Sequence, residues 1–346
     1  MRNDQRKAIK MEEIYFSIIM PTYNSESTIE MALKSIRNQD LPKASVEILV
    51  IDGGSVDATL EIAVRYHAIV LDNPKRFPEY AKRIGLAVAK GHWIVMQDSD
   101  EVLTDVSQLR KRKEFLEANS NIYSLILDKY IPGRGCGIAC AYVNWFGDPF
   151  SYIVYQLSDS RVRSNSKNLI KHTKKGNIYY YESNDIIPIG DGGTTTVDIR
   201  KAKELFGESY YTQEFAVSIF YKMVKQTHYV GCIPEDSITH YTSASFGTYL
   251  KKLRFRINTN LNEKEQSGYS VRAESSRILQ NRKILFVFYA LSIVFPLIDS
   301  IKMSISYRRP SLLLHLFYTY YVVIMIVWEL IRKTFHIKGK EYQYGK

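Results

Sequence analysis

The sequence is poor in cysteine and lacks an apolar segment at its start. Cysteine occurs three times in 346 residues, at Cys136, Cys140 and Cys232, and so sparse and odd a count argues against a disulfide framework. No second ligand pair accompanies Cys136 and Cys140, which favours buried small side chains over a metal site. Residues 1–10 are polar and hold no signal-peptide core, which predicts that the first domain stays in the cytoplasm.

The sequence also lacks the motifs of nucleic-acid-binding proteins, although its formal net charge is +11. We find no helix-turn-helix pattern, zinc finger or RNA-binding aromatic motif, so the charge does not indicate nucleic acid. The basic residues are dense after about residue 250, beside apolar segments, which favours an anionic membrane surface. Tyrosine is abundant, with 26 copies against 3 tryptophans, and suits both sugar contact and the polar edge of a membrane.

Short apolar runs alternate with helical patterns over the first 100 residues. Periodicity predicts buried strands at 16–20, 46–51, 68–71 and 93–97. Helices are expected from an N-cap at Ser25 or Ser27 to about Asn38, and over 58–66 and 78–89. This order predicts an α/β fold with a mainly parallel sheet and helices on both faces. Residues 101–240 are more mixed, with a strand at 124–127 and helices at 202–206 and 215–224.

The sharpest feature is the triplet Asp98-Ser99-Asp100, which directly follows the strand expected at 93–97. Residues i and i+2 of an extended run point to the same side, so both carboxylates can face one cation. Carboxylate oxygens suit Mg²⁺ or Mn²⁺, which bridge them to phosphates and neutralise charge on a departing diphosphate. Such triplets are also common on turns, and the wider context decides between the two interpretations.

That context is the order of polar motifs at the strand ends. Pro21 to Asn24 follows the first strand, Asp52 to Thr59 follows the second, and Ala81 to Gly85 precedes the fourth. With the acidic triplet, this set resembles the nucleotide-sugar-binding half of the GT-A glycosyltransferases of family 2, strongly over 16–103 and loosely to about 242. The resemblance implies a GT-A-like, Rossmann-like fold and metal-dependent, inverting transfer of a sugar from a nucleotide-diphosphate sugar.

The resemblance also implies site residues in this chain. The nucleotide sugar would be bound by Pro21, Thr22, Tyr23, Glu26, Asp52, Lys82 and Asp98. Asp52 would accept a hydrogen bond from the base, which suits uracil and favours a UDP-sugar over a GDP-sugar. Many relatives carry a second Asp where this chain has Gly53, which weakens that assignment. Asp98, Asp100 and His240 would hold Mn²⁺ or Mg²⁺, and Asp57 is expected to cap a helix.

The acceptor half is expected at residues 104–245, after a nucleotide-sugar-binding half at 12–103. A Gly-rich segment at 190–195, a turn at 205–208 and the pair Gln213-Glu214 follow in the order of the family. The second acid of that pair is usually the general base, so Glu214 is the candidate and Asp191 the runner-up. The alternative for Glu214 is stabilisation of a helix N-terminus. Residues 144–150 are aromatic; a core cluster is favoured over contact with sugar or membrane.

Residues 246–346 are predicted to form a basic, apolar tail with hydrophobic helices at about 284–301 and 311–331. A two-span hairpin would place Lys302, Arg308 and Arg309 outside, against the positive-inside tendency. Helices lying in the interface avoid that conflict, and a soluble helical core is a third interpretation. We expect the tail to attach the protein to the cytoplasmic face of a membrane, and we leave homo-oligomerisation through it open.

The predicted function is sugar transfer to a glycan or lipid-linked acceptor in cell-surface polysaccharide or glycoconjugate synthesis. The apolar tail makes a polyisoprenyl-phosphate glycosyltransferase the first alternative. The departures at Gly53 and Gln213 motivate a second, a non-catalytic membrane protein that binds nucleotide sugars. Nucleotidyl transfer is disfavoured because residues 21–25 form no Gly-rich, basic loop.

Overall fold

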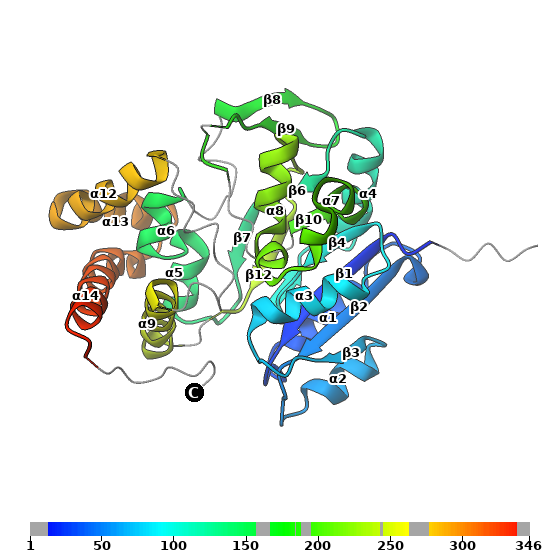
Figure 1. Ribbon diagram of the computed structural model, residues 1–346, viewed down its shortest axis with the longest axis horizontal. Helices are drawn as coiled ribbons and strands as arrows, with labels where there is room; N and C mark the ends of the chain where they lie inside the picture. The colour runs from blue at the N-terminus through cyan, green and yellow to red at the C-terminus, as the bar shows by residue number, and fades with distance from the viewer. Residues whose placement is uncertain are drawn as a thin grey trace, which may run out of the picture.

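A computed structural model describes residues 13–156, 167–183, 185–187, 195–242, 245–262 and 277–337. Within these residues two sheets carry the fold (Figure 1). The strands of the larger sheet are, in spatial order, β3 (Ile69–Asp72), β2 (Val46–Asp52), β1 (Phe16–Thr22), β4 (Trp93–Met96), β10 (Thr195–Asp198), β6 (Ser124–Leu125), β11 (Tyr229–Cys232), β9 (Asn177–Tyr180) and β8 (Leu169–His172). The smaller sheet contains β5 (Glu101–Leu103), β12 (Ser237–His240) and β7 (Lys129–Pro132).

The four strands predicted from the first 100 residues are confirmed, with the third shifted by one residue. β3, β2, β1 and β4 are parallel neighbours, whereas β10 runs antiparallel to β4 and opens a mixed half of the sheet. Parallel strands bring their carboxyl ends to one edge, so the residues after β1, β2 and β4 meet there.

Successive side chains of a strand point to opposite faces of the sheet, so alternate residues of the central strands belong to two separate cores. Ile18 and Ile48 face one core, which is covered by α1 (Ile29–Arg37), α2 (Thr59–Arg65) and α4 (Gln108–Ala118). Ile19 and Leu49 face the other, which is covered by α3 (Pro78–Val88), α7 (Ile199–Phe206) and α8 (Gln213–Thr227). The expected layering, with helices on both faces, is therefore confirmed.

The start of α1 differs from the prediction. Its N-cap is Thr28, with no side-chain hydrogen bond, rather than Ser25 or Ser27. The carbonyl of Ser25 instead accepts the N–H groups of Thr28 and Ile29, at 3.0 and 2.9 Å. A short backbone turn thus replaces the side-chain cap, because the chain must first pass Ser25 against Ser99, whose hydroxyls lie 2.9 Å apart.

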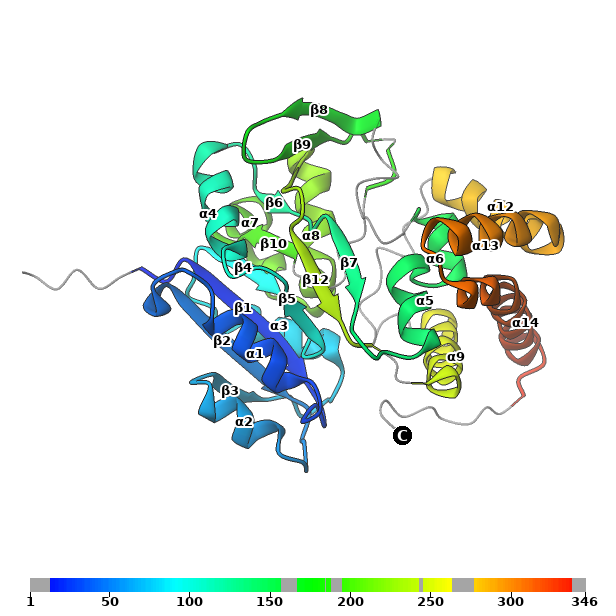
Figure 2. The ribbon, with the colours of Figure 1, turned by 180° about the vertical axis from the view of Figure 1, so that it is seen from behind.

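A third core joins residues on both sides of position 245. It is formed by α5 (Ile138–Phe146), α6 (Pro149–Val154), α9 (Phe246–Asn262), α12 (Arg277–Leu291), α13 (Val294–Ser306) and α14 (Leu314–Thr334). Trp145 and Phe146 are buried in it, which confirms the core interpretation of the aromatic segment. These helices lie at the end of the molecule opposite to α2 and β3 (Figures 1 and 2). Short 3-10 turns at Lys43–Ser45, Gly207–Tyr211 and Pro310–Leu313 complete the described elements.

The first hydrophobic helix of the tail is broken rather than continuous. α12 and α13 meet at an angle of 86°, where one helix had been expected over 284–301. Pro296 lies in the first turn of α13 and has no N–H to continue a helix across Ser292, so the chain turns at Ile293 with φ +58. Pro310–Thr334 is a single helical stretch of 25 residues.

A buried histidine joins α14 to the other helices of the third core. Tyr289 donates its O–H to Asp299 at 3.0 Å, so its oxygen accepts the N–H of His315 Nε2 at 2.9 Å. His315 Nδ1 is then free to accept the O–H of Tyr142, at 2.8 Å. This arrangement places one proton on the ring, and burial lowers the pKa of His315 to about 3.

Candidate active site

The acidic triplet forms a tight turn between β4 and β5, closed by the side chain of Glu101. Glu101 accepts the backbone N–H of Asp98 at 3.0 Å, and Gln97 donates its side-chain amide to the carbonyl of Glu101 at 2.8 Å. Burial, together with the charges of Asp98 and Asp100, raises the pKa of Glu101 well above its ordinary value. Glu101 therefore braces the turn through its hydrogen bond to the backbone of Asp98.

His240 faces this turn from β12. Its Nε2 lies 3.6 Å from Asp100 Oδ1, and its Nδ1 lies 3.2 Å from the amide oxygen of Asn144. The amide nitrogen of Asn144 donates to the carbonyl of His240, so Asn144 contacts both ring and backbone. Burial alone would raise the pKa of Asp100, but the charge of His240, its hydrogen bond and the charge of Lys252 hold it below its ordinary value.

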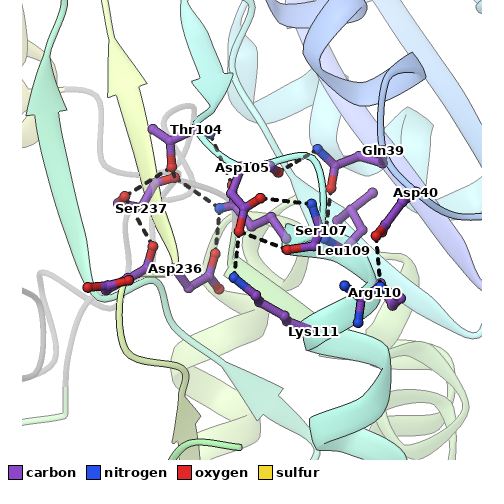
Figure 3. Close-up of polar contacts among 12 residues, drawn as sticks. Gln39, Asp40, Thr104, Asp105, Ser107, Leu109, Arg110, Lys111, Asp236 and Ser237 are labelled. Carbon is purple, nitrogen blue, oxygen red and sulfur yellow. Dashed lines mark hydrogen bonds and ion pairs between the residues drawn. The ribbon is translucent and has the colours of Figure 1, made fainter.

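Hydrogen bonds connect the start of β12 with the loop that precedes α4 (Figure 3). β12 pairs with β5 so that His240 lies opposite Glu101. Thr104 donates its hydroxyl to the carbonyl of Ser237 at 2.9 Å, and Asp236 forms an ion pair with Arg112 at 2.8 Å. The side chains that start β12 are thus bound to α4 and its preceding loop, which sets the register that brings His240 to Asp100.

Of the three residues predicted to hold a metal, His240 and Asp100 are therefore brought together, and Asp98 lies two residues before Asp100 in the same turn. Within the described residues, no three His, Cys, Asp or Glu side chains stand close enough to enclose an ion by themselves. Two carboxylates and one imidazole nevertheless fit Mn²⁺ or Mg²⁺, which keep ligand positions for phosphate oxygens and water. Gln97, next to Asp98, adds a buried Oε1 without a hydrogen-bond partner in the described chain.

Lys82 is buried on α3, and its charge acts on the same turn. Burial raises the pKa of Asp98, and the charge of Lys82 opposes that rise. Lys82 therefore lies close enough to the turn for its charge to act on Asp98. Its own role toward a diphosphate stays a prediction.

The carboxylate of Asp52 accepts hydrogen bonds from its own loop. Its Oδ2 accepts the backbone N–H groups of Gly54 and Ser55, both at 2.8 Å, and its Oδ1 accepts the hydroxyls of Thr22 and Ser55 at 3.3 and 2.5 Å. Contact with a base would have to replace one of the two hydroxyls, so this role also stays a prediction. Gly54 has φ +86, a conformation that favours glycine.

The other residues predicted at the base pocket surround this loop. Pro21 and Thr22 end β1, and Tyr23 lies beneath Arg76, whose guanidinium is 5.5 Å from the ring centroid. Glu26 accepts the N–H of Ala58 at the start of α2, and its place at the base pocket stays a prediction.

The N-cap of α2 is Ala58, without a side-chain cap hydrogen bond, rather than Asp57; Asp57 lies one residue earlier and still contacts the first turn. Its Oδ1 accepts the N–H of Thr59 at 3.0 Å, in the first turn of α2. Its Oδ2 accepts the N–H of Glu26 at 3.1 Å, so Asp57 and Glu26 tie the two loops to each other. Desolvation raises the pKa of Asp57, but the hydrogen bonds from Thr59 and Glu26 together hold it below its ordinary value.

The two candidates for the general base are less fully defined. Glu214 lies in the first turn of α8, which packs against α3 and β10, but its side chain is outside the described part of the chain. Asp191 lies outside the described residues. Both roles stay predictions.

Four residues of the site were missed from the sequence. Glu101 and Asn144 contact the predicted ligands, Arg76 covers Tyr23, and Lys252 on α9 acts on Asp100 and Asp98. Glu101 directly follows the triplet, so its position carried a signal. Asn144 and Lys252 lie in segments assigned to other roles and come to the site only through packing of the third core.

The parallel strands, the acidic turn at their carboxyl edge and the facing histidine define the GT-A class of folds. The solved mannosyltransferase PcManGT from Pyrobaculum calidifontis, in complex with GDP-Man and Mn²⁺, shares this fold with a TM-score of 0.52 and 14% identity, over 91% of this chain and 87% of that one. Residues 17–135 match the model of glycosyl transferase family 2, which confirms the resemblance over the donor half.

Two curated relatives are informative. The chain is 32% identical to the poly(ribitol-phosphate) beta-N-acetylglucosaminyltransferase TarS of Staphylococcus aureus over 126 residues, 35% of this chain and 22% of that protein. It is 24% identical to a dolichyl N-acetyl-alpha-D-glucosaminyl phosphate 3-beta-D-2,3-diacetamido-2,3-dideoxy-beta-D-glucuronosyltransferase of Methanococcus voltae over 315 residues, 86% of this chain and 89% of that one. The chain thus spans about a fifth of the length of TarS and most of the Methanococcus protein.

Proposed function

We propose that this protein is a metal-dependent, inverting glycosyltransferase that moves a sugar from a nucleotide-diphosphate sugar to a glycan or lipid-linked acceptor. The observation that carries the proposal is the meeting of Asp98, Asp100 and His240 at the edge of the sheet, with Lys82 on one side. This constellation suits a cation bound to a diphosphate, and the family assignment supports sugar transfer.

In the proposed reaction the acceptor oxygen attacks the anomeric carbon, and the bond from that carbon to the diphosphate oxygen breaks. Asp98, Asp100 and His240 would hold the cation, which supplies positive charge beside the departing diphosphate. Glu101 keeps the turn in shape, and Lys82 adds positive charge next to Asp98. Glu214 would take the proton of the acceptor hydroxyl. The acceptor oxygen would attack the face of the sugar opposite to the diphosphate, and this displacement inverts the anomeric configuration.

Titration calorimetry with UDP and GDP, in Mn²⁺ or in excess chelator, tests the donor site. We expect one diphosphate to bind only with the metal, and Asp100→Ala to abolish that binding. Asp105→Ala is the matched control, because Asp105 is an acid of the following loop that pairs with Lys111 outside the site. Equal binding with chelator, or full binding by Asp100→Ala, would refute the proposed metal site.

The acceptor is proposed to be lipid-linked. The Methanococcus protein, which the chain matches along most of its length, is named for a dolichyl-linked sugar phosphate. The third core also presents apolar helices beside the site. Transfer to the lipid phosphate itself is the second candidate, and product analysis with polyisoprenyl phosphate against a polyisoprenyl-linked sugar separates the two.

We also propose that α12, α13 and α14 rest in the membrane interface. Pro310–Thr334 is long and apolar enough to span, and only 28% of its most apolar stretch is buried by the protein. His315 and Glu329, which α14 buries against the other helices, support an in-plane position with one covered side. The bend between α12 and α13 supports the same position.

Vesicle flotation tests the interfacial proposal. Phe288 and Ile305 are 67% and 72% exposed, so Phe288→Glu and Ile305→Glu should release the protein without unfolding it. Val64→Glu is the matched control, because Val64 on α2 is 64% exposed and far from the tail. Flotation of the tail variants at the level of the control would contradict the proposal.

A further inference from the structure

Helix α9 belongs to the wall of the active site as well as to the third core. Tyr249 and Leu253 are buried in that core, and Tyr249 donates its hydroxyl to the carbonyl of Gly147 at 3.1 Å. α9 packs against α5, which carries Asn144, and against α14. The rotation of α9 about its axis is therefore set by buried contacts, and this setting decides which of its side chains reach the acidic turn.

Lys252 points toward that turn. Its Nζ lies 3.5 Å from the hydroxyl of Thr242, just beyond His240 in the chain. Desolvation lowers the pKa of Lys252, the charges of Asp100 and Asp98 oppose this, and the charge of Arg256 adds to it. Lys252 is therefore close enough to interact electrostatically with both carboxylates and with Arg256 on its own helix.

Arg256 follows Lys252 by four residues and shares its face of α9. Two like charges at this spacing repel each other, and within the described chain neither is ion-paired with a carboxylate. Such a pair is stabilised by an anion that both can reach. Guanidinium and ammonium groups are the usual protein ligands of phosphoryl oxygens.

We propose that Lys252 and Arg256 form a phosphoryl-binding site on α9, beside the acidic turn and on the side of the third core. Lys82, whose charge acts on Asp98, is the cation proposed for the donor diphosphate. The site on α9 therefore suits a phosphate of the acceptor, although the donor diphosphate has the same chemistry. Only this choice of source rests on the proposed transferase function.

Binding of two probes by Lys252→Gln and Arg256→Gln distinguishes the sources. The acceptor-side probe is decyl phosphate, with decanol as its neutral match, and the donor-side probe is UDP with Mn²⁺. Lys251→Gln is the control, because Lys251 is exposed on the same helix but points about 100° away. Lys252→Arg keeps the charge and should keep binding.

We expect each glutamine variant to weaken decyl phosphate binding about tenfold, or ~1.4 kcal/mol, and Lys251→Gln to change it less than twofold. UDP binding should stay unchanged in Arg256→Gln and Lys251→Gln. Loss of UDP binding alone would keep the phosphoryl site but assign it to the donor. Losses no larger than in the control, for both probes, would overturn the site.

The same experiment separates this inference from the proposed function. If wild-type protein fails to bind any nucleotide with Mn²⁺, the proposed transferase is refuted. A tenfold loss of decyl phosphate binding in Lys252→Gln would still establish the site on α9.

Discussion

The buried ion pair between Arg112 and Asp236 offers a sharp test of how the site is supported. The side chains are 1% and 3% exposed, and two N–H groups of Arg112 donate to Asp236 at 2.8 and 2.9 Å. Gln108 donates to the same carboxylate. The pair binds α4 to the turn that starts β12, the strand that carries His240.

Removing one partner leaves the other charge buried. The usual cost of breaking a buried pair is about 3–5 kcal/mol. Arg112 retains a hydrogen bond to the hydroxyl of Thr196 at 3.3 Å, so Asp236→Ala should lower the free energy of unfolding by about 3 kcal/mol. Replacing both residues, as in Arg112→Met with Asp236→Ala, leaves no unpaired charge and should cost less than the sum of the two single variants.

Urea unfolding of the four proteins of this double-mutant cycle measures the coupling. We expect a coupling of at least ~2 kcal/mol, together with weaker metal-dependent nucleotide binding in Asp236→Ala because β12 is displaced. A single-variant cost below ~1 kcal/mol would refute the reasoning, as would a double variant equal to the sum of the two singles.

Three further predictions follow from particular contacts. In Gly91→Ala the new Cβ would lie 2.7 Å from the backbone nitrogen of Ser17, so thermal unfolding should show a loss of about 1–3 kcal/mol. His315 has a pKa of about 3 in the folded protein, below its unfolded value, so its contribution to stability is full above about pH 6.5. This contribution should fall by up to ~1.4 kcal/mol per pH unit on acidification, a slope that His315→Gln should reduce in urea titrations. Glu101→Gln should bind Mn²⁺ and nucleotide like the wild type, because the amide oxygen of glutamine can still accept the N–H of Asp98. Glu101→Ala, which lacks this acceptor, should bind more weakly. Equal binding by the two variants would contradict the bracing role.

The sequence alone predicted the donor half well because its signals are local. A strand buried on both faces is a continuous apolar run, and the polar residues that follow it must lie at the carboxyl edge of a parallel sheet. Asp98 and Asp100 were therefore predictable from one turn. His240 was predicted only through the resemblance, since nothing near it in the chain points to a metal.

Only the tertiary structure decided the parts of the site that depend on packing between distant segments. The break at Pro296 was visible as a residue, but the 86° bend was not, because the direction after a helix break depends on what the next helix packs against. Asn144 and Lys252 reach the acidic turn because buried aromatic side chains set the rotation of α5 and α9. Local sequence determines which residues form a helix and which of its faces is apolar. Which neighbour covers that face, and hence where its polar side chains point, is decided by the free energy of the whole core.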